Sequence, residues 1–405
     1  MAHMRAGFAL FLAVPLFAQD DKPAPKFDQK KIDRAIESGI RYLKKLVSDP
    51  AFYEKRNQMN ADWGVSPRQL YELIVWTFLH AEVSPRDEPL RRLFKLAVEE
   101  PLWKTYNVAF QAMIFRKLGA TRYHALLLEC AQFLVDTQYP NGQWSYPYDG
   151  SFRGPGASSA RKSLSESADA KPDEPAKRGK IEKPGGGMTH SGTPDNSNSQ
   201  YAALGIRACS DAGVDFPKEV LQRSRDWLVK CQNYDGGWPY LLPGGLGPES
   251  KEGEIRHPSY GSMTLGAIGS LSIFDKLLGE NFKKDQSVVR GLDWMGKRFE
   301  AEKHPGMEER YNPIKDKRMI GEMMYYLYSM ERAGDMVGTE TFGKRSWYPE
   351  GAAFLLKVQS REGYWQDPST ESPPVATCFA ILFLKRATSP LIETEDSTKP
   401  KSDKR

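Results

Sequence analysis

The sequence has little of several features that would point directly to a functional class. Its 57 Lys and Arg residues are nearly balanced by 52 Asp and Glu, and the net charge of +5 is spread without a basic stripe. A nucleic-acid partner is therefore not expected. No apolar run reaches the roughly 20 residues that a membrane-spanning helix needs, so no transmembrane segment is expected in the mature chain. The 40% hydrophobic content nevertheless suffices for a full globular core.

Cysteine is also scarce, and its placement excludes the usual structural zinc sites. The four cysteines stand at no metal-ligand spacing, and each lies within an apolar helical pattern. We expect buried free thiols, although the sequence leaves one disulfide open. They are Cys130, Cys209, Cys231 and Cys378.

The N-terminus has the pattern of a secretory signal peptide. Residues 4–18 (MRAGFALFLAVPLFA) place one Arg before an apolar run that ends at Ala18 and is followed by two aspartates. We expect residues 1–18 to be removed, residues 19–29 to form a linker, and the mature protein to be periplasmic or extracellular. Leu16 is not the small residue preferred near a cleavage site, so the position of the cut stays open.

A short motif, Q-x3-G-x-W, occurs three times, each time after an amphipathic pattern. Its chemistry is structural: Gln satisfies carbonyls at a helix end, Gly permits a left-handed turn, and Trp fills the corner between helices. We interpret the motif as a structural staple; residues 60–64 (NADWG) form a degenerate fourth copy. Its residues are Gln138, Gly142 and Trp144, then Gln232, Gly236 and Trp238, then Gln359, Gly363 and Trp365.

Helical periodicity fills the intervals between the motifs. Helices before the motifs are highly charged, whereas those after them are rich in small and apolar residues, which suits an outer and an inner ring. Twelve helices are predicted, over residues 30–47, 67–84, 87–98, 105–118, 121–138, 195–212, 216–231, 260–277, 284–300, 317–335, 345–359 and 373–386.

Alternating outer and inner helices predict an all-α fold, an α/α toroid of six outer and six inner helices in one domain over residues 30–387. The first helix is then outer and the last inner, so six pairs can close into a ring. Every outer helix ends, and every inner helix begins, at the same rim. We therefore expect the functional site at the mouth surrounded by the inner-helix N-termini.

Three segments interrupt or follow the helical pattern. Residues 150–188 are polar and rich in Gly and Pro, which predicts a disordered insertion beside the mouth, with a lid as the alternative. Residues 239–258 form a second, more apolar rim loop. Residues 388–405 are polar, and we expect a disordered tail there.

Three Q-x3-G-x-W turns in an all-helical chain resemble the superfamily of squalene and hopene cyclases and protein prenyltransferase β subunits. More closely, the chain resembles exported bacterial prenyltransferase and squalene oxidase repeat proteins. This likeness rests on DNSNSQYAALGIRAC (195–209), CQNYDGGWPY (231–240), SYGSMTLGAIGSL (259–271), MMYYLYSMERAG (323–334) and WYPEGAAFLLKVQSREGYW (347–365). The resemblance implies a terpenoid-cyclase-like toroid with a ligand cavity at its centre.

The catalytic signatures of these relatives are missing. Hopene-type cyclases protonate an alkene with a D-x-D-D-T segment, but residues 195–199 read Asp-Asn-Ser-Asn-Ser, which leaves Asp195 as the only acid. The D-x-C pair of the zinc-dependent prenyltransferases is absent, so no catalytic metal is expected. One turn, QYPNGQWSYPY (138–148), also resembles toroidal pectate lyases, which implies calcium and a base; Asp195, Asp235 and Arg318 would be the set for that alternative.

Candidate site residues follow from their expected positions at the mouth. Asp195 is either a residual acid or the N-cap of a helix, and the amides after it exceed what a cap requires. The two loop histidines could act as bases or simply be exposed, and the aromatic residues could line the cavity or pack in the core. The candidates for ligand contact are Asn196, Asn198, Gln200, His190, His257, Tyr260, Glu322, Tyr326 and Trp238.

Together these features predict an exported toroid that binds a small-molecule, lipid or glycan ligand, or a protein partner, in its central cavity. No cofactor is expected, and calcium only if the lyase alternative holds. Whether the protein is an enzyme stays open. The alternatives are a polysaccharide-processing, pectate lyase-like enzyme and a terpenoid-cyclase-type enzyme that uses Asp195.

Overall fold

A computed structural model describes residues 28–58, 66–146, 159–165, 179–181, 192–241, 257–307, 311–312, 317–318, 321–366 and 372–391. Helices dominate this part of the chain, and its strands form three two-residue pairs. The predicted all-α class is confirmed. None of the described helices is long and apolar enough to cross a membrane.

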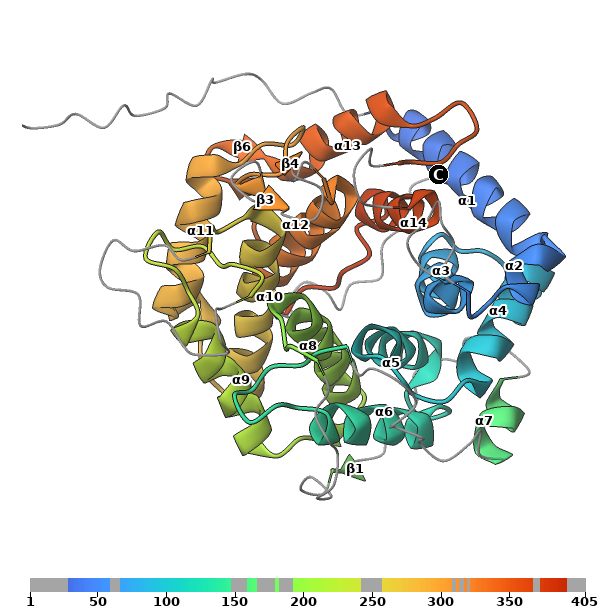
Figure 1. Ribbon diagram of the computed structural model, residues 1–405, viewed down its shortest axis with the longest axis horizontal. Helices are drawn as coiled ribbons and strands as arrows, with labels where there is room; N and C mark the ends of the chain where they lie inside the picture. The colour runs from blue at the N-terminus through green and yellow to red at the C-terminus, as the bar shows by residue number, and fades with distance from the viewer. Residues whose placement is uncertain are drawn as a thin grey trace, which may run out of the picture.

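Six helices form a closed inner ring (Figure 1). Each contacts the next in chain order, and the last contacts the first. These helices are buried nearly all round; in α10 every residue from Gly261 to Asp275 is buried, because neighbours cover each of its faces. The ring consists of α3 (Tyr71–His80), α5 (Thr105–Gly119), α8 (Asn196–Asp211), α10 (Gly261–Leu278), α12 (Met323–Val337) and α14 (Pro373–Leu384).

Six outer helices surround this ring, and most of them keep one face exposed to solvent. In α1, for example, the buried positions Ile32, Ile36, Leu43 and Val47 follow helical spacing, and the charged side chains face solvent. Helix α1 packs against α14 and α13, so the two ends of the fold are neighbours and the predicted toroid closes. The outer helices are α1 (Gln29–Ser48), α4 (Glu88–Glu99), α6 (His124–Asp136), α9 (Lys218–Lys230), α11 (Gln286–Arg298) and α13 (Trp347–Val358).

All twelve predicted helices correspond to these two rings, but their boundaries differ. The largest error is the predicted start at residue 317: α12 begins at Met323, because the preceding residues form an antiparallel pair and Glu322 adopts a left-handed conformation (φ 57°). The sequence pattern also missed several short elements. They are α2 (Pro50–Glu54), η4 (Phe282–Lys284), β3 (Tyr311–Asn312), β4 (Lys317–Arg318), β5 (Thr341–Phe342) and β6 (Arg345–Ser346). The predicted helix 67–84 includes η1 (Pro67–Leu70), a 3-10 turn directly before α3.

The insert at residues 150–188 contains two structured pieces, which corrects the expectation of disorder for these residues. Helix α7 (Ser159–Leu164) lies against α4, and β1 (Gly179–Lys180) pairs in parallel with β2 (Val214–Asp215). Arg161 anchors α7: its side chain is 2% exposed and donates to Glu129 Oε2 at 2.6 Å and to the Val98 carbonyl at 2.8 Å. Other residues of the insert lie outside the described part of the chain.

The ordered domain also continues past the predicted end at residue 387. The backbone and hydroxyl of Thr388 donate to the Glu331 carboxylate at 2.7 and 2.9 Å. Leu391 is buried, and Arg207 donates to the carbonyls of the two residues before it. The beginning of the expected disordered tail is therefore attached to α12 and α8, while residues 392–405 lie outside the description, as do residues 242–256 of the second rim loop.

The glutamines of the repeated turns connect successive outer helices. In each turn the Gln side-chain amide donates to a backbone carbonyl of the next outer helix, at 2.8–2.9 Å. Each Gly has φ between +93° and +96° and packs against the backbone of that same helix. The three bonds are Gln138 to Val220, Gln232 to Ser287, and Gln359 to Ala35.

The tryptophans of the turns are fully buried and join the preceding outer helix to the following inner helix. Each indole N–H donates to a carbonyl of the outer helix at 2.8–2.9 Å, and each Trp backbone N–H donates to a hydroxyl of the inner helix at 3.1–3.2 Å. The degenerate fourth copy at residues 60–64 lies outside the described residues. The indole acceptors are Leu134, Leu228 and Leu355, and the hydroxyls belong to Ser199, Thr264 and Thr377.

Candidate functional site

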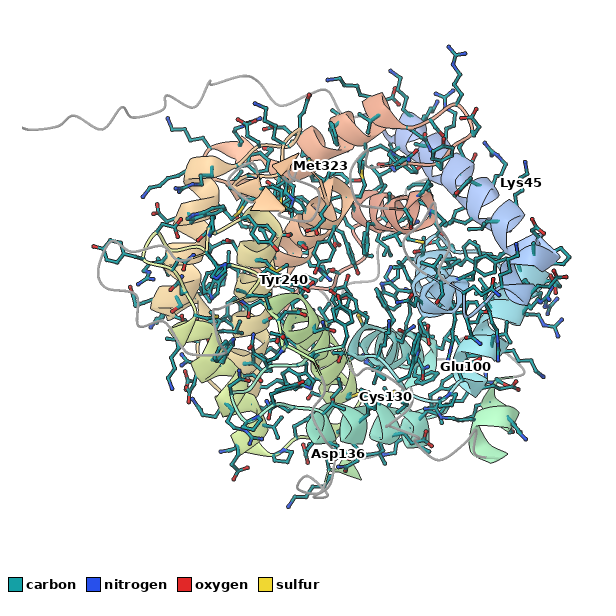
Figure 2. All side chains as sticks on the ribbon, viewed as in Figure 1. Lys45, Glu100, Cys130, Asp136, Tyr240 and Met323 are labelled. Atoms are coloured by element: carbon teal, nitrogen blue, oxygen red, sulfur yellow. The ribbon has the colours of Figure 1, made fainter. Side chains whose placement is uncertain are left out.

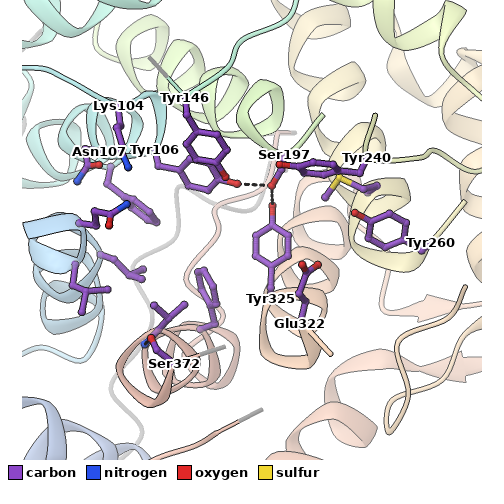
Figure 3. Close-up of a pocket in the computed structure, with 17 residues that line it drawn as sticks. Lys104, Tyr106, Asn107, Tyr146, Ser197, Tyr240, Tyr260, Glu322, Tyr325 and Ser372 are labelled. Carbon is purple, nitrogen blue, oxygen red and sulfur yellow. Dashed lines mark hydrogen bonds between the residues drawn. The ribbon is translucent and has the colours of Figure 1, made fainter. Parts of the chain in front are cut away.

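A cavity of about 500 Å³ lies at the N-terminal ends of the inner helices (Figure 3). All six inner helices contribute residues from their first turns or the residues just before them, which is the arrangement expected for the mouth of the toroid. Its walls are formed by Gln69, Leu70, Leu73, Lys104, Tyr106, Asn107, Phe110, Tyr146, Ser197, Tyr240, Tyr260, Met263, Glu322, Tyr325, Ser372, Val375 and Phe379.

The cavity combines apolar walls with phenol groups. Five tyrosines line it, together with leucine, phenylalanine, methionine and valine side chains. The rings of Tyr106 and Tyr146 stack at 5.6 Å with an angle of 5° between them, and the ring of Tyr201 lies 4.1 Å from that of Tyr106. Such a lining suits a ligand with a large apolar or aromatic part and a few hydrogen-bonding groups.

Two charged side chains line the cavity on opposite sides, Lys104 and Glu322 (Figure 3). The Lys104 ammonium lies 5.8 Å from the centre of the Tyr146 ring, and burial, with a smaller contribution from Arg68, lowers the pKa of Lys104. Glu322 stands at the N-terminus of α12, where the helix dipole favours a carboxylate. The cavity therefore has a cationic side and an anionic side.

A chain of hydrogen bonds connects the cavity wall with a buried arginine. The Ser197 hydroxyl bonds to the hydroxyls of Tyr106 and, at 2.6 Å, Tyr325 (Figure 3). Tyr325 accepts a hydrogen bond from the Gln200 amide, whose oxygen accepts one from Arg332 at 2.9 Å. Burial raises the pKa of both Tyr106 and Tyr325, so these phenols remain protonated donors at neutral pH.

Asp195 caps α8 and lies one side chain away from the cavity. Its Oδ1 accepts from the backbone N–H of Asn198 at 2.6 Å, and its Oδ2 accepts from the Asn198 side-chain amide at 2.8 Å. Burial raises the pKa of Asp195 to about 6, although hydrogen bonds from Asn198 and from Tyr240, which does line the cavity, oppose this shift. Asp195 itself is 2% exposed and does not form part of the wall.

The three amides predicted to contact ligand point elsewhere. Asn196 connects the first and second repeated turns, because it accepts a hydrogen bond from Gln143 at 3.0 Å and donates one to the carbonyl of Pro239 at 2.7 Å. Asn198 serves the cap of Asp195, and Gln200 lies beneath the cavity wall as part of the chain to Arg332. None of these three lines the cavity, whereas Ser197, between two of them, does.

Of the remaining candidates, Tyr260 and Glu322 line the cavity. Trp238 fills the corner of its turn, and His257 presents its backbone carbonyl to Asn233 without reaching the wall. His190 lies outside the described residues.

Tyr326, the last candidate for ligand contact, does not line the cavity. The Tyr326 hydroxyl donates to the Glu300 carbonyl at 3.0 Å, and its ring stacks on His304 away from the wall. The cavity residue on this helix is Tyr325, one position earlier.

Both aspartates of the set proposed for a lyase have other partners. Asp235 binds the hydroxyl of Ser259 at 2.8 Å and the indole N–H of Trp294 at 2.7 Å, while Asp195 caps α8. The side chain of Arg318 lies outside the description. Across the described ranges no group of three His, Cys, Asp or Glu side chains is placed to hold a metal ion. All four cysteines are free and buried.

The sequence pattern missed several residues that build the site, namely Lys104, Tyr106, Tyr146 and Arg332. Lys104 and Tyr106 stand at the start of an inner helix, so their position in the predicted toroid was an available signal. Tyr146 follows a Q-x3-G-x-W turn by two residues, as Tyr240 follows the next, and both line the cavity. For Arg332, deep in α12, the sequence carried no such signal.

No protein-family model and no curated protein matches the sequence. Among solved structures, the chain is similar to a variant of the type II terpene cyclase MstE from Scytonema in complex with its substrate geranylgeranyl dihydroxybenzoate, with a TM-score of 0.30 and 11% identity over 88% of this chain and 97% of that chain. Apo MstE gives a TM-score of 0.29 and 11% identity over 88% and 98%. At this level the similarity says nothing about chemistry or ligand.

Proposed function

We propose that this toroid is an exported ligand-binding protein whose central cavity holds a small organic molecule with a large apolar or aromatic part. The observation that carries the proposal is the cavity of about 500 Å³, lined by apolar side chains and five tyrosines at the inner-helix N-termini. A volume of this size suits a drug-sized ligand. The resemblance to exported prenyltransferase and squalene oxidase repeat proteins is consistent with this assignment.

Proton transfer from Asp195 is not part of the proposal, because its carboxyl is held by hydrogen bonds within the fold. Both oxygens of Asp195 accept hydrogen bonds from Asn198, and Tyr240 stands between the carboxyl and the cavity. A general acid must reach the atom that it protonates. Polysaccharide cleavage is likewise not favoured, since the carboxylates proposed for it are bound to other groups.

The test is native mass spectrometry of the mature protein purified from the compartment in which it accumulates, followed by extraction of any bound molecule. We expect a complex with one organic ligand per chain. Val375→Trp, which places a large ring in the cavity wall, should remove the ligand, whereas Val358→Trp on the exposed side of α13 should retain it. A bound uronate or oligosaccharide, or equal ligand content in the two variants, would contradict the proposal.

A further inference from the structure

Arg332 is a buried cation beneath the cavity wall. Its side chain is 4% exposed, and its guanidinium lies over the rings of Tyr328 and Tyr201, with distances of 4.4 and 4.9 Å to the ring centres. Among the described residues no carboxylate lies within ion-pair distance of Arg332. The nearby acids on α12 have other partners: Glu331 binds Thr388, and Asp335 binds Arg386.

Arg332 determines which group donates and which accepts in the series of hydrogen bonds that leads to the cavity. Arginine only donates, so the Gln200 oxygen must face Arg332 and the Gln200 nitrogen must donate to the Tyr325 hydroxyl. The Tyr325 hydroxyl keeps its own proton for donation to Ser197 or Tyr106, both of which line the cavity. From Arg332 to Tyr325, both bonds therefore run from donor to acceptor in the direction of the cavity.

Resting on the proposed function, we infer that the ligand carries an anionic oxygen group and that the hydroxyls of Tyr106 and Ser197, backed by Arg332, recognise it. A buried cation polarises the hydrogen bonds that it donates, and bonds to charged acceptors are stronger than those to neutral ones. Lys104 lies on the same side of the cavity as Tyr106, and Glu322 lies opposite (Figure 3). This separation orients an anion toward Tyr106 and the apolar body toward the other walls.

Two fluorescent probes with the same ring skeleton separate this inference from the proposed function. Anilinonaphthalenesulfonate carries a sulfonate, whereas N-phenylnaphthylamine is neutral. We expect the wild-type protein to bind the sulfonate on the order of tenfold more tightly than the neutral probe. Tyr325→Phe and Ser197→Ala, which break the series of hydrogen bonds at two points while Arg332 stays, should each bring the ratio of the two probe affinities close to one.

Tyr326→Phe is the matched control, because this neighbouring phenol on α12 donates to the Glu300 carbonyl and takes no part in the series of hydrogen bonds from Arg332. It should keep the wild-type preference. The inference is overturned if the two probes bind the wild-type protein equally, or if the preference survives both Tyr325→Phe and Ser197→Ala. If neither probe binds, the proposed function fails together with the inference; if the neutral probe alone binds, only the inference fails.

Discussion

At the residue scale, Asp195 combines a structural role with a buried charge. Replacing it by Ala removes the acceptor for the backbone of Asn198, whereas Asn keeps an acceptor oxygen without the charge. We expect Asp195→Ala to be less stable than Asp195→Asn by about 1 kcal/mol or more at pH 7.5. Urea unfolding of the two variants measures this difference, and equal stability would show that Asp195 does not act as a cap.

Glu72 makes stability depend on pH. It is fully buried and accepts from Asn107 at 2.6 Å and Gln111 at 3.1 Å, and burial raises its pKa from 4.5 to about 7. The folded state therefore holds the proton more tightly than the unfolded state, so ionisation of Glu72 costs stability as pH rises from 4.5 to about 7. Above that range the cost is constant.

The expected result is a change in the stability of the wild-type protein relative to Glu72→Gln, which cannot titrate at this position. The difference in the free energy of unfolding should fall by up to about 3 kcal/mol between pH 4.5 and pH 7.5. Urea titrations of both proteins at four pH values within this range measure it. A constant or rising difference would mean that the pKa of Glu72 is not raised in the folded protein.

Individual cavity residues were harder to predict than capping residues. Asp195 was recognisable as a cap because an Asp followed by Asn and Ser residues begins a helical pattern. The choice between Tyr325 and Tyr326 could not be made, because α12 is buried on every side and no polar face fixes its rotation. Neighbouring residues on a helix point about 100° apart, so this ambiguity placed the wrong tyrosine in the cavity.

At the scale of elements, each repeated turn requires glycine for two reasons: a left-handed backbone and close contact with the next outer helix. Gly142 has φ +96°, and a Cβ at this position would lie 2.3 Å from the carbonyl oxygen of Arg223. Gly279, at the end of α10, has φ +82°, but a Cβ there would meet nothing within 4 Å. Comparing substitutions at Gly279 and Gly142 therefore distinguishes two contributions to the loss of stability. One is the strain of the left-handed backbone, and the other is close packing against α9.

We expect Gly279→Ala to lower the free energy of unfolding by about 1 kcal/mol, from backbone strain alone. Gly142→Ala should cost about 3 kcal/mol or more, because the backbone of α9 must also move. Thermal and urea unfolding of the two variants provide the comparison. Similar losses in both would contradict the role of the turn in joining successive outer helices.

Helix existence was predictable at this scale, but anchoring points were not. The twelve predicted helices follow from apolar periodicity, which reports burial along a whole element. The structured piece α7 is anchored by Arg161, whose side chain is buried although the segment around it is polar. The average composition of a segment does not show that one of its side chains is buried and holds it in place. The polar tail is a second case, since Thr388 is bound to Glu331.

At the scale of the whole molecule, ring closure places the functional residues. Six inner helices start at one rim, so residues more than 250 positions apart, such as Tyr106 and Phe379, line one cavity. Tyr240, another residue of the cavity wall, lies near the centre of the toroid in Figure 2. The order of outer and inner helices was sufficient to predict this mouth, whereas the contacts around Arg332 required the structure.

Export of the protein is a prediction for the whole chain. Expressed in a secreting bacterium, the protein should lose its N-terminal apolar run by a cut near Ala18, and the intact mass of the secreted protein measures the position of that cut. Leu12→Arg, which puts a charge in the apolar run, should retain the precursor in the cytoplasm. Recovery of the uncleaved wild-type chain from the cytoplasm would contradict export.

The binding of neutral N-phenylnaphthylamine to the purified protein tests most directly whether the cavity is a ligand site. We expect saturable binding of one probe per chain to the wild-type protein and to Val358→Trp, with a fluorescence increase as the probe leaves water. Val375→Trp should abolish this binding while its unfolding temperature remains close to that of the wild type. Unchanged binding to a folded Val375→Trp variant would place the probe elsewhere and contradict a ligand site at the inner-helix N-termini.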